Sequence, residues 1–91
     1  MIRGFKCKKT ERLFNGVRVP AFSGFKRQAE KRLRILDASE TLVTLKALLS
    51  NRFEALSGDR AGSYSIRVNT QWRVCFTWDE GANEVEIVDY H

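Results

Sequence analysis

The hydrophobic period of this chain changes near its middle, and that change constrains the fold more than any other feature. Before residue 51, apolar residues recur at intervals of three and four, as on one face of a helix. From Ser63 onward they alternate with polar residues in steps of two, as on a half-buried strand. Helices must then cover one face of a sheet, which predicts an α+β fold. A chain of 91 residues has the usual size of one domain, so we expect a single domain over 1–91.

The first half contains three predicted helices. A short helix is expected over 8–14, and a longer one over 24–38 with Ser23 as its N-cap. Ser39 is expected to cap a third helix that carries leucines at three positions between 42 and 49. The longer helix is expected to bury one stripe against the sheet, formed by Phe25, Ala29, Leu33 and Leu36.

The second half predicts an antiparallel meander of three strands joined by short turns. Opposed residues of an antiparallel pair point to the same face, so the buried phases of neighbouring strands must coincide. A loop over 69–71 meets this condition by pairing Val68 with Trp72. The same register sets Arg67 opposite Arg73 on the exposed face, where two guanidinium groups repel each other unless an anion or carboxylate lies nearby.

A third strand would bring the end of the chain to that face. Pairing Trp78 with Val85 places Tyr90 opposite Arg73. Guanidinium groups bind phosphate, a phenol ring can stack on a base, and carboxylate and imidazole groups carry protons. Sheet arginines are also commonly solvated or paired with a neighbour such as Glu86, so both interpretations stay open. The candidate site residues are Arg60, Arg67, Arg73, Asp89, Tyr90 and His91.

Basic residues are concentrated in the first half of the chain. Residues 1–52 hold thirteen basic and four acidic side chains, whereas residues 53–91 hold three and seven. Ten of the sixteen cations are arginine, whose planar guanidinium matches phosphate, and this favours nucleic acid over a merely solvated surface. The exposed face of the longer helix is a candidate RNA contact through Lys26, Arg27, Lys31 and Arg34.

Several other classes of protein are disfavoured. The longest apolar runs fall far short of the roughly 18 residues that cross a bilayer, and the first residues lack an apolar signal region, so a cytoplasmic protein is expected. Two cysteines without a C-x-x-C spacing predict free thiols, and a single histidine leaves no convincing zinc set. We therefore expect no metal and no cofactor.

Two stretches of the chain resemble a known family of toxins. They are residues 58–76, GDRAGSYSIRVNTQWRVCF, and residues 85–91, VEIVDYH, and they are similar to the HigB-type toxins, the plasmid maintenance killer branch of the RelE/ParE superfamily. The resemblance implies the RelE/ParE-like toxin fold and the toxin of a bacterial type II toxin–antitoxin system. It implies a helix-turn-helix antitoxin of the HigA type as partner, with operator DNA contacted only through that antitoxin. It also implies metal-independent cleavage of messenger RNA in the ribosomal A site.

Such cleavage is a transesterification by the 2′-hydroxyl of the RNA, which needs a base, a cation for the phosphate and an acid for the leaving oxygen. Matching positions imply that Arg73 stabilises the phosphate and that Tyr90 orients or stacks on the nucleotide. They imply that Asp89 and His91 transfer protons or support proton transfer. Arg60 and Arg67 are auxiliary cations by the register argument.

One segment departs from the family pattern. Many relatives carry histidine or lysine just before Gly-Asp-Arg, but here residues 52–57 read RFEALS. Ser57 cannot act as a phosphate cation and Glu54 is anionic, which predicts slow cleavage. A gyrase poison of the ParE kind and a non-catalytic, antitoxin-binding corepressor are the alternative functions.

Overall fold

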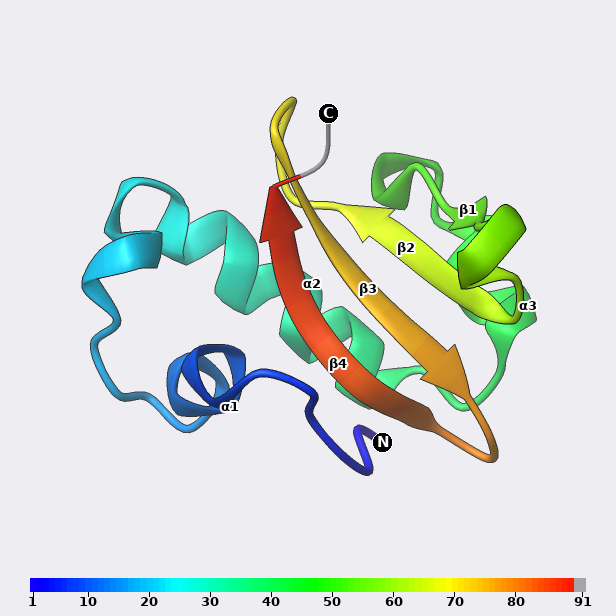
Figure 1. Cartoon of the computed structure of the whole chain (residues 1–91), viewed down its shortest axis with the longest axis horizontal. Helices are drawn as coiled ribbons and strands as arrows, with labels where there is room; N and C mark the ends of the chain where they lie inside the picture. Colours follow the sequence, from blue (N-terminus) through cyan, green and yellow to red (C-terminus); the bar gives the residue numbers. More distant parts are fainter. Residues whose placement is uncertain (90–91) are drawn as a thin grey trace.

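The computed structural model describes residues 1–89 and confirms the α+β architecture (Figure 1). The helices are α1 (Lys8–Phe14), α2 (Lys26–Ala38) and α3 (Leu42–Ala47), with short 3-10 helices η1 (Pro20–Phe25), η2 (Leu49–Asn51) and η3 (Gly58–Arg60). The strands are β1 (Glu54–Ala55), β2 (Ser63–Arg67), β3 (Trp72–Trp78) and β4 (Ala82–Asp89). Within the described residues they form one antiparallel sheet in the order β1-β2-β3-β4.

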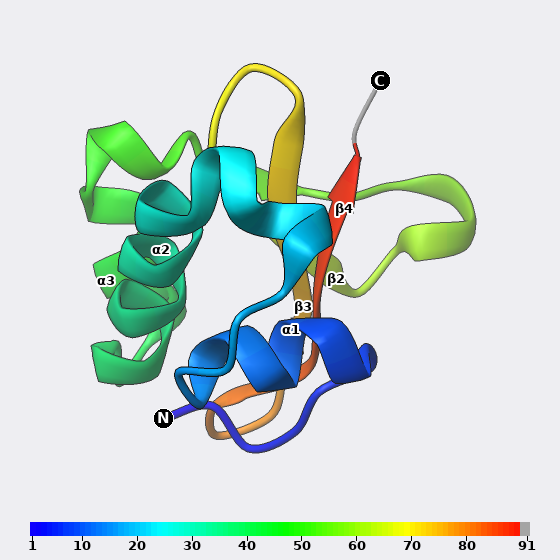
Figure 2. The same ribbon diagram turned by 90° about the vertical axis from the view of Figure 1, so that its left-hand side faces the viewer.

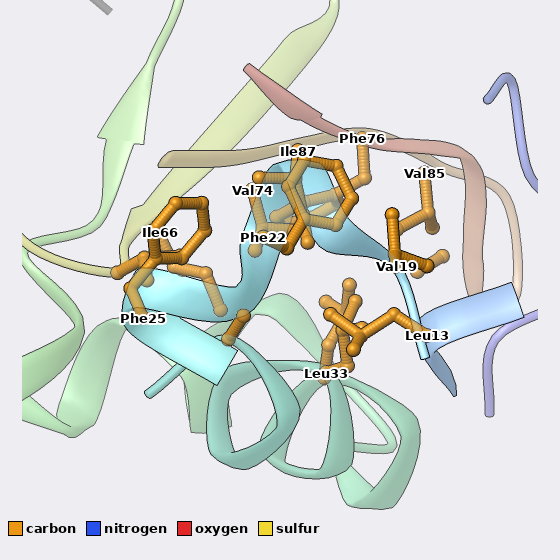
Figure 3. Close-up of a cluster of buried hydrophobic side chains, with 14 of the residues drawn as sticks. Leu13, Val19, Phe22, Phe25, Leu33, Ile66, Val74, Phe76, Val85 and Ile87 are labelled. Carbon is orange, nitrogen blue, oxygen red and sulfur yellow. The ribbon is translucent and has the colours of Figure 1, made fainter. Parts of the chain in front are cut away.

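The helices lie on one side of the sheet, and η3 lies on the other (Figure 2). The predicted stripe of α2 is buried: Ala29, Leu33 and Leu36 are fully inaccessible, and Phe25 stacks on Trp72 with ring centroids 4.8 Å apart. These residues meet the apolar side chains of β2, β3 and β4 in one core (Figure 3). The two-residue period of the strands therefore identified the face that the helices cover.

Two predicted helix caps are wrong. Ser23 does not begin a helix, because residues 20–25 form η1 and the Ser23 hydroxyl donates to the Pro20 carbonyl at 2.9 Å. Ser39 ends α2, where its hydroxyl donates to the Ile35 carbonyl at 2.8 Å. The N-cap of α3 is Thr41, whose side-chain oxygen accepts from the Thr44 amide.

The predicted β2–β3 register is confirmed, whereas the predicted β3–β4 register is wrong. Arg67 pairs with Arg73, but Arg73 faces Val88 on β4 instead of Tyr90. The turn after β3 is tighter than expected: the Asp79 amide bonds the Gly81 carbonyl at 2.9 Å, and β4 already begins at Ala82.

A bulge then absorbs one extra residue of β4. The register shifts between Cys75 and Thr77, and Glu84 has a left-handed backbone (φ 49°). Near Arg73 the observed pairing differs from the predicted one by two residues, a full strand period. The buried face of β4 is therefore the predicted one, because a two-residue shift does not change which way a side chain points.

Candidate functional site

Arg67 and Arg73 lie side by side on the sheet face that the helices do not cover. They are Cα partners in the β2–β3 ladder, so both side chains point to the same face. Arg67 is half-buried, and Arg73 is only 8% exposed. Two neighbouring guanidinium groups in this position make the local potential strongly positive.

Hydrogen bonds within the chain hold the Arg73 guanidinium in place. Nε donates to the Ser65 hydroxyl at 2.7 Å, and Nη2 donates to the Ser65 carbonyl at 3.4 Å and to the Arg52 carbonyl. Arg52 has a left-handed backbone (φ 48°, ψ 50°), which orients this carbonyl toward Arg73. The orientation of Arg73 is thus fixed by β2 and by the segment that leads into β1.

A surface groove opens beside these arginines. It has a volume of about 380 Å³ and combines cations, neutral polar groups and one carboxylate, from Arg52, Glu54, Arg67, Asn69, Thr70 and Arg73. We call it the arginine groove. Guanidinium groups bind phosphate oxygens through paired hydrogen bonds, so a groove with three of them is chemically suited to a polyanion.

The end of β4 reaches the same end of the sheet. Asp89 pairs with Trp72, one residue from Arg73, and its Oδ2 accepts from Gln71 Nε2 at 3.0 Å. Successive strand residues point to opposite faces, so Asp89 belongs to the face of Trp72, which the helices cover, and it is not among the residues that line the arginine groove. The two remaining predicted residues of the terminus, Tyr90 and His91, lie outside the described residues.

Arg60 lies on the same outer face, farther along the strands. Its Nη2 is 3.9 Å from Glu86 Oε1, and Lys6 Nζ is 3.5 Å from Glu86 Oε2. Glu86 is the β4 partner of Cys75, two residues from Arg73 along β3. Arg60 therefore belongs to an ion-pair network next to the arginine groove and is not among the groove's lining residues.

The four cations predicted on the longer helix lie elsewhere. Lys26, Arg27, Lys31 and Arg34 are exposed on α2, whose opposite side packs on the sheet. They therefore belong to the outer surface of the helical layer, across the sheet from Arg67 and Arg73 (Figure 2). The structure does not bring these two groups of cations together.

Sequence reasoning missed part of the groove. Arg52, Asn69 and Thr70 line it but were not candidates. The signal was present in the segment before Gly-Asp-Arg, because β1 pairs Glu54 with Ser65 and so carries this segment to Arg73. A strand of two residues is too short to be recognised from hydrophobic alternation in the sequence.

Burial raises the pKa of the Cys75 thiol. The nearby charge of Glu86 raises this pKa further, whereas that of Arg60 lowers it.

Within residues 1–89, no cluster of three His, Cys, Asp or Glu side chains could hold a metal ion. The same residues include no helix long and apolar enough to cross a membrane.

Comparison with known proteins identifies the family. The family model described as "RelE-like toxin of type II toxin-antitoxin system HigB" matches residues 4–91. The protein Toxin HigB-1 of Vibrio cholerae serotype O1 (strain ATCC 39315 / El Tor Inaba N16961) is 41% identical over 61 residues. That alignment covers 67% of this chain and 64% of the relative, slightly less than two thirds of its length. This chain therefore belongs to the HigB family of RelE-like toxins of type II toxin–antitoxin systems.

Proposed function

We propose that this chain is a ribosome-dependent messenger RNA endonuclease that inhibits translation and growth when its antitoxin is lost. It acts in the cytoplasm on RNA in the ribosomal A site and needs no metal. Its partner is a helix-turn-helix antitoxin of the HigA type, through which it also reaches operator DNA. The observation that carries the proposal is the arginine groove, in which three guanidinium groups line one surface and Arg73 is held in place by the protein.

The chemistry assigns a separate task to each part of the site. Cleavage by the 2′-hydroxyl concentrates negative charge on the phosphate, and a cation that is already oriented stabilises that charge without further reorganisation. Arg73 fits this role because Ser65 and the Arg52 carbonyl fix it before substrate arrives. Arg67 adds a second cation. The resemblance assigns nucleotide orientation to Tyr90 and proton transfer to Asp89 and His91.

The groove also supports slow cleavage. Glu54 supplies its carboxylate, and the segment before Gly-Asp-Arg brings no imidazole or lysine to it. The ribosome can impose the in-line geometry that cleavage requires. This can lower the activation barrier by several kcal/mol, because free RNA seldom adopts that geometry. Arg60 would add an auxiliary cation. Contacts with ribosomal RNA on other sides of the molecule would come from Lys26, Arg27, Lys31 and Arg34.

Primer extension on messages undergoing translation tests the proposal. Wild-type protein should produce cuts within codons, and Arg67→Ala should reduce them about tenfold or more by removing a phosphate cation. Arg12→Ala, an exposed cation on α1, is the matched control and should cut like wild type. Intact transcripts with wild-type protein, or equal cutting by Arg67→Ala, would contradict the proposal.

One observation favours the corepressor alternative. Arg73 is nearly buried and hydrogen-bonded to the protein, which a purely structural role would also explain. A non-catalytic module predicts that deletion of residues 89–91 leaves growth inhibition unchanged, whereas the nuclease hypothesis predicts that this deletion abolishes growth inhibition.

A gyrase poison would instead be revealed by inhibition of DNA supercoiling with purified protein.

A further inference from the structure

Exposed apolar side chains gather on one short stretch of the helical layer. Among residues 1–89, the large hydrophobic side chains left exposed are those of Met1, Val17, Val43, Leu48 and Leu49. Three of these belong to residues 43–49, with Val43 73%, Leu48 42% and Leu49 87% exposed. Scattered exposed residues need no explanation, but a cluster of them is typical of an interaction surface.

Two side chains of this stretch, Leu48 and Leu49, line an open groove between α3, η2 and the start of β1. The groove has a volume of about 770 Å³ and is lined by Lys46, Leu48, Leu49, Ser50, Arg52 and Phe53. We call it the α3–η2 groove. Its charged lining residues are both cations, and Lys46 Nζ lies 5.6 Å from the centre of the Phe53 ring. The surface therefore combines aliphatic contacts with a positive rim.

This combination fits a protein segment better than RNA. Single-stranded RNA is recognised by aromatic or guanidinium planes on which bases stack. Here the exposed surface is mainly aliphatic, and the Phe53 ring already stacks on Tyr64 at 5.5 Å. Aliphatic side chains with flanking cations complement a segment that carries leucine-like residues next to carboxylates.

We propose that the α3–η2 groove binds an acidic, amphipathic segment of the antitoxin. This inference rests on the proposed function for the existence of that partner and adds the surface and the chemistry of the contact.

Its position would link binding to inhibition. Arg52 lines both the α3–η2 groove and the arginine groove, and its carbonyl accepts from Arg73. A carboxylate that holds the Arg52 side chain would remove one of the arginine groove's cations. The segment would thereby weaken RNA binding without covering Arg73.

Calorimetric titration with the helix-turn-helix antitoxin that the proposed function requires tests the inference. Leu49→Glu removes an apolar contact and adds a charge that repels an acidic segment, at a side chain exposed enough to leave folding intact. We expect Kd to rise at least tenfold. Val17→Glu makes the same change at a separate exposed position and should alter Kd less than twofold. Circular dichroism melting of both variants should match wild type.

A cellular assay uses the same variants. Expressed alone, Leu49→Glu should inhibit growth like wild type, but co-expressed antitoxin should no longer neutralise it. Equal antitoxin affinity for Leu49→Glu and wild type would overturn the inference, as would weaker ribosome co-sedimentation with unchanged antitoxin affinity. If wild type itself fails to bind the antitoxin, the proposed toxin–antitoxin function fails instead.

Discussion

The contact between Ser65 and Arg73 allows a quantitative test of how the site is built. Ser65 is fully buried, and its hydroxyl accepts from Arg73 Nε at 2.7 Å. Replacement by alanine removes only this oxygen and leaves a charged donor without its partner in a site that is nearly closed to water. Hydrogen bonds to charged groups contribute about 1.5–3 kcal/mol, and an unsatisfied buried donor costs a similar amount. We therefore expect Ser65→Ala to lower the free energy of unfolding by about 2 kcal/mol.

Urea denaturation followed by circular dichroism measures this loss, and a domain of this size should also show a Tm lower by roughly 4–8 °C per kcal/mol. Ser63→Ala is the matched control, two residues earlier on the same strand. Ser63 is half-buried and lacks the contact with Arg73, so its replacement should cost less than about 0.5 kcal/mol.

A double-mutant cycle separates the contact from the rest of each side chain. Arg73→Met removes the charge and keeps most of the aliphatic length, so the Ser65→Ala change should cost much less in that background. We expect a coupling energy of about 1–2 kcal/mol, within the range for residues in direct contact. Additive effects, with a coupling energy below about 0.5 kcal/mol, would refute the claim that Ser65 holds Arg73.

Four further predictions concern the core, a turn and the two thiols. Leu33→Ala should lower the free energy of unfolding by about 2–5 kcal/mol in urea titrations, because Leu33 is fully buried; a loss below 1 kcal/mol would contradict the packing. Gly81→Ala should lower Tm, because Gly81 has φ +147° and an added Cβ would lie 2.6 Å from the Met1 carbonyl oxygen; an unchanged Tm would refute this close approach. At pH 8 a thiol reagent should label the half-buried Cys7 much faster than the buried Cys75, and equal rates would be inconsistent with the structure. Burial raises the pKa of Cys75 in the folded state. Its contribution to stability is therefore complete below the pKa of the unfolded state and is lost as pH rises through the higher folded value, so the free energy of unfolding should be lower at pH 10 than at pH 8.

Periodicity predicted the layers of this fold because burial acts on whole faces. The change of period from 3.6 to 2 located the helices and the sheet, and the stripe of α2 is buried as expected. The β3–β4 register was wrong because it depends on local turn geometry. Glu80 and Gly81 have positive φ angles, and their tight turn starts β4 at Ala82. A two-residue error leaves the faces unchanged, so the core could be predicted although the pairing was not.

The candidate site could be predicted where it depends on strand pairing alone. Arg67 and Arg73 followed from the loop length over 69–71, and they are Cα partners. Arg52 could not be found in this way, because its place depends on a left-handed backbone and on a hydrogen bond from a residue 21 positions away. Contacts of this kind arise only once the sheet has formed.

The buried state of Arg73 explains how one residue can support both the fold and the proposed chemistry. A flexible surface arginine loses side-chain entropy when it binds phosphate, and that loss weakens binding. Arg73 loses this freedom during folding instead, because Ser65 and the Arg52 carbonyl already fix its guanidinium. Its desolvation is likewise offset by these protein oxygens before any RNA arrives. Removing the Ser65 hydroxyl that holds Arg73 should therefore reduce RNA cleavage although the charge of Arg73 is kept. In folded protein, Ser65→Ala should reduce cleavage more than Arg12→Ala, which removes an exposed cation.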